Sequence, residues 1–202
     1  MDSEKLKKLV GNFKQRNVEV EYFESLEDVR SYILHIVPVE STIGIGHSAT
    51  LQKIDITNLL LERGNVVYDK ELAKNRDESR ELKRKALTTD WYITGSNAIS
   101  VDGRIVNVDH TGNRVAAITY GPDQVIIVVG KNKVVDTVDE AIKRVKNVAC
   151  PINAKRAGYN PPCVTLNHCV DCVGVCNILS IIGGQTDSNR IKIFIVNEEC
   201  GF

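Results

Sequence analysis

The densest reactive chemistry in this chain is a run of cysteines. Cys163, Cys169, Cys172 and Cys176 follow one another with five, two and three residues between them. The last three reproduce part of the spacing with which bacterial ferredoxins hold iron–sulfur clusters through thiolates. The run departs from that pattern in its long first gap and in Asn177, which stands where a proline would follow the last cysteine.

Four thiols spaced in this way leave several kinds of chemistry open. Zinc accepts the same ligands, and His168 could replace one of them. Cys169 and Cys172 form a Cys-x-x-Cys pair that could act in thiol exchange. Burial of all four thiols without a ligand is the remaining alternative. Among the liganded forms we favour an iron–sulfur cluster of the [4Fe–4S] type, with zinc as the second choice.

A glycine-rich turn between an expected strand and an expected helix is the first candidate binding loop. It contains Gly44, Gly46, His47, Ser48 and Thr50. Glycines let a ligand approach the backbone, and a helix N-terminus offers unpaired N–H groups to an anion. His47 adds a group that titrates near neutral pH. The loop matches neither the dinucleotide fingerprint nor a Walker loop, and a tight turn with Ser48 as N-cap is the alternative.

A second candidate loop leaves the end of another expected strand. It begins with Gly95, Ser96 and Asn97. Open α/β sheets place their ligands at such strand ends, and small polar side chains can donate and accept hydrogen bonds there. Ordinary turn chemistry is the alternative.

The third candidate loop gathers an acid, an imidazole, a glycine, an amide and a guanidinium in six residues. It starts at Asp109 and ends with Gly112, Asn113 and Arg114, just before a short expected helix. Arginine suits bidentate binding of a carboxylate or phosphate, and a solvated surface arginine is the alternative. If the protein is an enzyme, His47 and Asp109 are the acid–base candidates.

The elements that must position these loops alternate between strands and helices. Apolar periodicity predicts strands at 18–23, 41–45, 65–68, 91–95, 124–130 and 191–196, and helices at 3–16, 25–37, 51–60, 76–88, 137–148 and 174–182. Asp102-Gly103 predicts a β-hairpin over 99–106. The unbroken apolar run at 125–129 is typical of a central parallel strand. The pattern predicts a layered α/β/α fold with a mostly parallel sheet, in a single domain of residues 1–202. A cysteine-rich appendage is expected at about 151–180.

Composition restricts the class of protein. The 202 residues carry 26 basic and 26 acidic side chains, which argues against broad nucleic-acid binding. No apolar run is long enough to span a membrane, and the polar first residues resemble no signal peptide. A cytoplasmic protein with reduced thiols is therefore expected. Cys150 and Cys200 stand apart from the cysteine run and are expected to be buried structural residues.

An ordered series of short motifs also carries a resemblance. The series is Gly95-Ser96-Asn97-Ala98, Asp102-Gly103, Gly112-Asn113-Arg114-Val115, the run from Val125 to Gly130 with Lys131 and Lys133, Ala141-Ile142, Arg144, Pro151 and Arg156. It resembles the LUD-domain family of lactate-utilisation proteins over roughly residues 41–176. The resemblance implies a fold like that of ribose-5-phosphate isomerase and the CoA transferases. In that fold the first strand–loop–helix turn, here 44–50, commonly holds an anion. Family members are linked to oxidation of lactate to pyruvate with iron–sulfur partner proteins.

Three functions compete at this point. The first is a redox accessory protein in lactate or organic-acid utilisation, which binds a small anionic metabolite in the three loops, carries the cluster and works with an iron–sulfur partner. The second is a stand-alone enzyme acting on a sugar phosphate or an acyl-CoA, with structural zinc at the cysteines. The third is a non-catalytic regulatory module whose cysteine segment folds around a metal.

Overall fold

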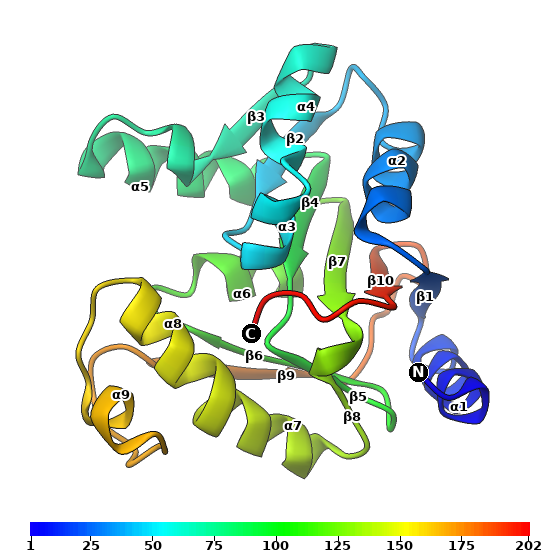
Figure 1. Ribbon diagram of the computed structural model, residues 1–202. Helices are drawn as coiled ribbons and strands as arrows, with labels where there is room; N and C mark the ends of the chain where they lie inside the picture. The colour runs from blue at the N-terminus through cyan, green and yellow to red at the C-terminus, as the bar shows by residue number, and fades with distance from the viewer.

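A six-stranded sheet forms the centre of the molecule (Figure 1), in a computed structural model that describes residues 1–202. All neighbouring strands are parallel. Their order across the sheet is β1 (Val18–Phe23), β10 (Ile191–Val196), β7 (Gln124–Gly130), β4 (Trp91–Gly95), β2 (Thr42–Ile45) and β3 (Val66–Asp69). The six strands predicted from apolar runs are thus present, and the strand at 124–130 lies inside the sheet as expected.

Strand β7 shows why both faces of the sheet are covered. Val125, Ile127 and Val129 point to one hydrophobic cluster, whereas Ile126 and Val128 point to another. All five are fully buried, and burying one such side chain stabilises a fold by about 1.5–3 kcal/mol. Because successive side chains alternate between the faces, an unbroken apolar run requires cover on both.

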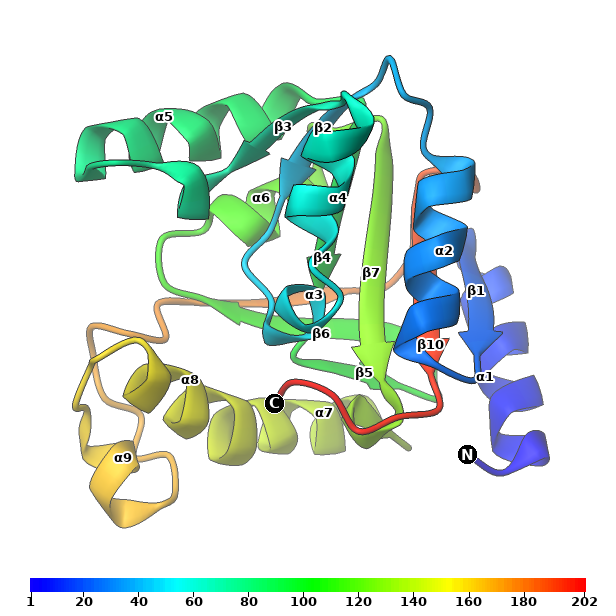
Figure 2. The same cartoon turned by 45° about the horizontal axis from the view of Figure 1, so that its top comes forward.

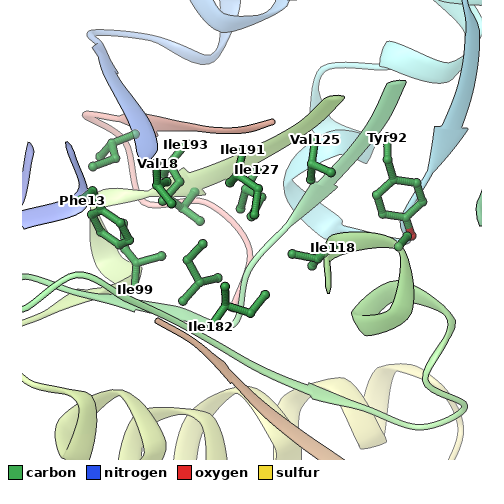
Figure 3. Packing of buried hydrophobic residues seen from close by; sticks show 14 of the residues in the cluster. Phe13, Val18, Tyr92, Ile99, Ile118, Val125, Ile127, Ile182, Ile191 and Ile193 are labelled. Carbon is green, nitrogen blue, oxygen red and sulfur yellow. The ribbon is translucent and has the colours of Figure 1, made fainter. Parts of the chain in front are cut away.

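Helices supply that cover. On one face lie α2 (Leu26–Ile36), α3 (Ala49–Lys53) and α4 (Ile56–Arg63), and on the other lie α1 (Ser3–Lys14) and α6 (Asn113–Thr119) (Figure 2). Helix α2 begins with a capping box, in which Ser25 and Asp28 satisfy each other's backbone N–H groups. Figure 3 shows Phe13 of α1 and Ile118 of α6 against the same face of the sheet.

A second, four-stranded sheet packs beside the first. Its strands lie in the order β8 (Val134–Val135), β5 (Ala98–Ser100), β6 (Arg104–Asp109) and β9 (Ile178–Ile182). The hairpin predicted at Asp102-Gly103 is β5–β6, and Gly103 takes the positive φ of +84° that the turn requires. The helix expected at 174–182 is wrong, because Ile178–Ile182 pairs with β6 as an antiparallel edge strand.

A long helical segment covers the outer face of the small sheet. It consists of α7 (Val138–Arg144), a π-helical stretch η4 (Val145–Ala149) and α8 (Cys150–Arg156). Ala141 and Val145 pack there against Ala98 and Val106. Helix α9 (Pro162–Leu166) and an irregular loop at 167–177 then lead to β9.

The remaining elements lie around the main sheet. Helix α5 (Arg76–Lys85) is solvated and is flanked by the short turns η1 (Lys70–Leu72) and η2 (Ala86–Thr88), while η3 (Lys131–Lys133) follows β7. None of the helices has the length and apolar character needed to cross a membrane. The layered α/β fold predicted from the sequence is confirmed; the second sheet was not predicted.

Candidate functional site

A cleft of about 470 Å³ opens at the carboxyl ends of the main-sheet strands. The loops that follow β2, β3, β4 and β7 contribute to it, together with residues 201–202 after β10. Helix α8 and the loop after β6 form the opposite wall. Open parallel sheets place their ligands at this edge, because helix N-termini and loops converge there.

The cleft brings together residues from all three candidate loops and from the cysteine run. Those lining it are His47, Ser48, Gly95, Ser96, Asn97, Asp109, Asn113, Arg114 and Cys176. Seven other candidates do not line it: Gly44, Gly46, Thr50, Gly112, Cys163, Cys169 and Cys172. The three loops, up to 70 residues apart in the sequence, therefore share one site: the first two follow β2 and β4 of the main sheet, and the third follows β6 of the second sheet and faces them across the cleft.

The glycines of the first loop are closely packed against neighbouring strands. A Cβ atom on Gly44 would come within 2.8 Å of the Ala86 carbonyl oxygen, and one on Gly46 within 2.7 Å of Tyr92 Oη and against Thr94. On the side where a side chain would point, protein atoms therefore fill the space at both glycines. Ser48 precedes α3 as the N-cap residue, but its side chain makes no capping hydrogen bond.

Arg114 links the second and third candidate loops through hydrogen bonds. One terminal nitrogen donates to the carbonyl oxygen of Gly95 and to Oδ1 of Asn107, at 3.1 and 2.6 Å. The other donates to Oδ1 of Asn97 and to the carbonyl oxygen of Val108, at 2.9 and 2.8 Å. The terminal N–H groups that bidentate binding would use are thus engaged within the protein, and only Nε–H remains for a ligand. The role of Arg114 is to position the loops.

Asp109 has a comparable structural role. Its Oδ2 atom accepts hydrogen bonds from the backbone N–H groups of Arg114 and Val115, at 3.0 and 3.2 Å. These are unpaired donors in the first turn of α6, so the carboxylate caps that helix. Gly112, whose φ is +84°, makes the turn into the helix. The geometry therefore assigns Asp109 a capping function, and His47 is the better acid–base candidate.

His47 is held by a carboxylate that the sequence analysis overlooked. Its Nδ1 atom lies 3.1 Å from Oε1 of Glu71, while Nε2 is buried without a hydrogen-bond partner. Burial and the positive charges of Lys70 and Arg156 lower the pKa of His47, and Glu71 opposes them only in part. The lowered pKa favours the neutral ring, whose Nε2 lone pair is buried without a partner.

Positive charge dominates the cleft wall. Five cationic side chains line it against two carboxylates; the cations are Lys70, Lys83, Arg114, Lys133 and Arg156. Burial, followed by the charge of Lys70, lowers the pKa of Lys83. The guanidinium of Arg156 lies 6.0 Å from the ring centre of Phe202. Sequence reasoning missed Lys70, Lys83 and Arg156 as binding residues because nothing around them forms a binding motif.

Two thiols, Cys150 and Cys176, line the same cleft. A hydrogen bond from Cys150 stabilises the Cys176 thiolate and lowers the pKa of Cys176 to about 7. That same contact, together with burial, raises the pKa of Cys150. Cys150 is buried, as expected, but its position against the cysteine run was not foreseen.

The cysteine run has the donor chemistry of a metal site without a finished coordination shell. All six cysteines are free thiols. Burial raises the pKa of Cys163, and the charges of Cys172, Cys176 and Cys169 raise it further. No three His, Cys, Asp or Glu side chains are grouped so that they could hold one metal ion. Thiolates of this kind are ligands of iron–sulfur clusters and of zinc.

The cysteine run is joined to the cleft by backbone contacts. Asn177 donates its backbone N–H to the carbonyl oxygen of Asp109, at 3.2 Å, and its side chain to that of His110, at 2.9 Å. The His110 ring lies 3.2 Å from the carbonyl oxygen of Val175. Strand β9 continues this pairing, with Ile178 opposite Asp109. The third candidate loop and the end of the cysteine run thus form one unit.

Comparisons with known proteins agree with this architecture. The family model for the LUD domain matches residues 6–196. A crystal structure of a DUF162 family protein from Deinococcus radiodurans is similar in fold, with a TM-score of 0.56 and 17% sequence identity. The match covers 96% of this chain and 98% of that one. No curated protein matches the sequence significantly. Since the family model spans nearly the whole chain, the protein belongs to the LUD-domain family.

Proposed function

We propose that this LUD-domain protein is a redox accessory protein in lactate or other organic-acid utilisation. It binds a small carboxylate in the cleft and carries an iron–sulfur cluster on Cys163, Cys169, Cys172 and Cys176. The observation that carries the proposal is that the cationic cleft and the cysteine run share a wall, at Cys176. A protein that couples a metabolite to electron transfer needs the two sites to be adjacent.

Different side chains of the cleft would attract the carboxylate and accept its proton. Lys70, Lys83 and Arg156 attract the carboxylate, because cations in a partly enclosed site are less screened than on an open surface. His47 lines the cleft and is oriented by Glu71, so it is the candidate base for a hydroxyl group of the ligand once Nε2 becomes accessible to that group. An iron–sulfur cluster would supply one-electron transfer when bound. An iron–sulfur protein is the expected partner, since electrons must leave the site.

Metal and acid-labile sulfide analysis of protein purified without oxygen tests the cysteine run. About four irons and four sulfides per chain, with a brown colour, are expected. Serine substitution at each of the four positions should reduce the iron content severalfold. The matched control is Cys200→Ser, which removes a buried thiol outside the run and should leave the iron content unchanged. A colourless protein with one zinc would contradict the redox role.

Calorimetry with lactate, pyruvate and inorganic phosphate tests the cleft. Binding of a carboxylate should weaken with added salt, and Lys83→Gln and Arg156→Gln should each lower the affinity several-fold. Lys143→Gln, on the exposed side of α7, is the control and should change nothing. Preference for phosphate over both carboxylates, together with one bound zinc, would favour a stand-alone enzyme acting on a phosphate ester. That enzyme is the second candidate because His47 is already oriented as a base.

A further inference from the structure

A lysine without a counter-ion lies at the inner wall of the cleft. Lys133 ends the turn η3 directly after β7 and is only 3% exposed. Its Nζ atom donates one hydrogen bond within the protein, to Oγ1 of Thr50 at 3.4 Å, which is close to the limit for such a bond. None of the ion pairs of the protein includes Lys133. Buried lysines are normally paired, so this amine lacks the partner that a structural role would provide.

The surroundings of Lys133 favour the neutral amine. Burial lowers its pKa to about 8. The charges of Arg144 and Arg114 also lower this pKa, whereas the charge of Cys200 raises it. Roughly a tenth of such an amine is unprotonated at pH 7, compared with well under a thousandth for an ordinary lysine. An uncharged amine in a partly desolvated site is a nucleophile.

The groups around the amine also define what could react with it. Arg114 lines the same cleft, its charge acts on Lys133, and its Nε–H makes no hydrogen bond within the protein. The space over the amine is narrow, since a Cβ atom on Gly201 would lie 2.8 Å from Nζ. A suitable reactant is therefore small, has a carbonyl carbon for the amine, and bears an adjacent carboxylate for the cations.

We propose that Lys133 forms a reversible imine with a small 2-oxo carboxylate in the cleft. The Nζ lone pair attacks the carbonyl carbon and gives a carbinolamine. Loss of water then forms the C=N bond, and hydrolysis reverses both steps without a change of oxidation state. This inference rests on the proposed function, because it names the class of carboxylate that the cleft would take.

Reductive trapping tests the imine. The purified protein is incubated with glyoxylate or pyruvate and cyanoborohydride, and intact mass and peptide mapping follow. Addition of the mass of the oxo acid less one oxygen atom is expected, on Lys133. Lys133→Arg keeps the charge but removes the nucleophile, so labelling should fall at least tenfold. Lys131→Arg is the matched control on the same turn, where the lysine amine donates to Asn197, and should label like the wild type.

The outcomes separate this inference from the proposed function. Labelling spread evenly over Lys70, Lys83 and other lysines would overturn the imine, as would labelling that survives Lys133→Arg. Absence of trapping while oxamate, a carboxylate without a ketone, still binds in calorimetry would overturn the imine and leave the anion site intact. Absence of both would overturn the anion site as well. Peptide mapping of the wild-type protein decides the question even if Lys133→Arg does not fold.

Discussion

The Nδ1 atom of His47 lies 3.1 Å from Oε1 of Glu71, and the other ring nitrogen is buried without a partner. This arrangement places the ring proton on Nδ1 and the lone pair on Nε2. His47 comes from the loop after β2, and Glu71 from η1 after β3, so two neighbouring strand ends create the pair. A base oriented by a carboxylate is the recurring arrangement in sites that move protons.

Replacing Glu71 should make His47 harder to protonate. Burial already lowers the pKa of His47 below 6.5, and Glu71 is the group that raises it. Glu71→Gln is therefore expected to lower this pKa further, as measured by NMR titration of the ring. Glu81→Gln, which alters an exposed ion pair of α5, is the control. A rise in the His47 pKa in Glu71→Gln would contradict the assignment.

The lowered pKa of His47 determines the direction in which stability changes with pH. His47 binds protons less readily in the folded than in the unfolded protein, so its contribution to stability is complete above about pH 6.5. That contribution falls as the pH drops from 6.5 toward the lowered pKa of the folded state. Urea unfolding across this pH range should show a smaller loss for His47→Gln than for the wild type.

Arg114→Lys should destabilise the protein. Lysine cannot reach the four acceptors on Gly95, Asn97, Asn107 and Val108 that the guanidinium bonds together. A loss of about 2–4 kcal/mol in the free energy of unfolding is expected, because partly buried acceptors would remain unpaired. Arg30→Lys, in an exposed pair with Glu27, should change stability by less than about 0.5 kcal/mol. Equal effects of the two substitutions on stability would contradict the role of Arg114 in linking the loops.

Two glycine substitutions should act in opposite directions. Gly46→Ala would push a methyl group against Thr94 and Tyr92, both buried, and should cost about 1–3 kcal/mol. Gly11→Ala lies on the exposed side of α1 with nothing within 4 Å, and should stabilise by roughly 0.5–1 kcal/mol. Thermal unfolding of both variants measures the difference. If Gly46→Ala leaves the stability unchanged, the space beside Gly46 is not closed by Thr94 and Tyr92 and could admit a ligand.

Cys176 should be the most readily alkylated thiol in the reduced, metal-free protein. The hydrogen bond from Cys150 lowers the pKa of Cys176 to about 7, so its thiolate is well populated at neutral pH. Iodoacetamide labelling followed by peptide mapping should give a half-maximal rate near pH 7. Cys150→Ala removes the donor and should move that midpoint upward, whereas Cys200→Ala should leave it in place. An unchanged midpoint in Cys150→Ala would show that Cys150 does not stabilise the Cys176 thiolate.

The sequence predicted those elements whose signals are local. The strand at 124–130 and the helix at 25–37 depend on the order of adjacent residues, and both were predicted correctly. The segment 178–182 was mistaken for a helix because its pairing partner, β6, lies about seventy residues away. The close packing of the loop glycines could not be predicted for the same reason: Thr94 and Tyr92, which fill the space beside Gly46, belong to another strand.

The candidate site was predictable in part. Asn97 was predicted because parallel strands place ligands at their carboxyl ends, His47 because a glycine-rich turn enters a helix there, and Arg114 because varied polar residues gather before a short helix. Glu71 could not be found, because a charged residue in a polar stretch is most often solvated. Arg156 and Lys133 belong to the motif series that resembles the LUD-domain family, but their places on the cleft wall, and the burial of Lys133, depend on packing that no single segment reveals.

The pairing of Asn177 and Ile178 with Asp109 has a thermodynamic consequence. The loop that borders the cleft and the end of the cysteine run share hydrogen bonds, so ordering one segment also restricts the other. Two binding events that draw on the same ordering are coupled, and the coupling is reciprocal. If an ion on the thiols changes the affinity of the cleft for its ligand by some factor, that ligand changes the affinity for the ion by the same factor. The protein would then respond to metal supply and metabolite level jointly.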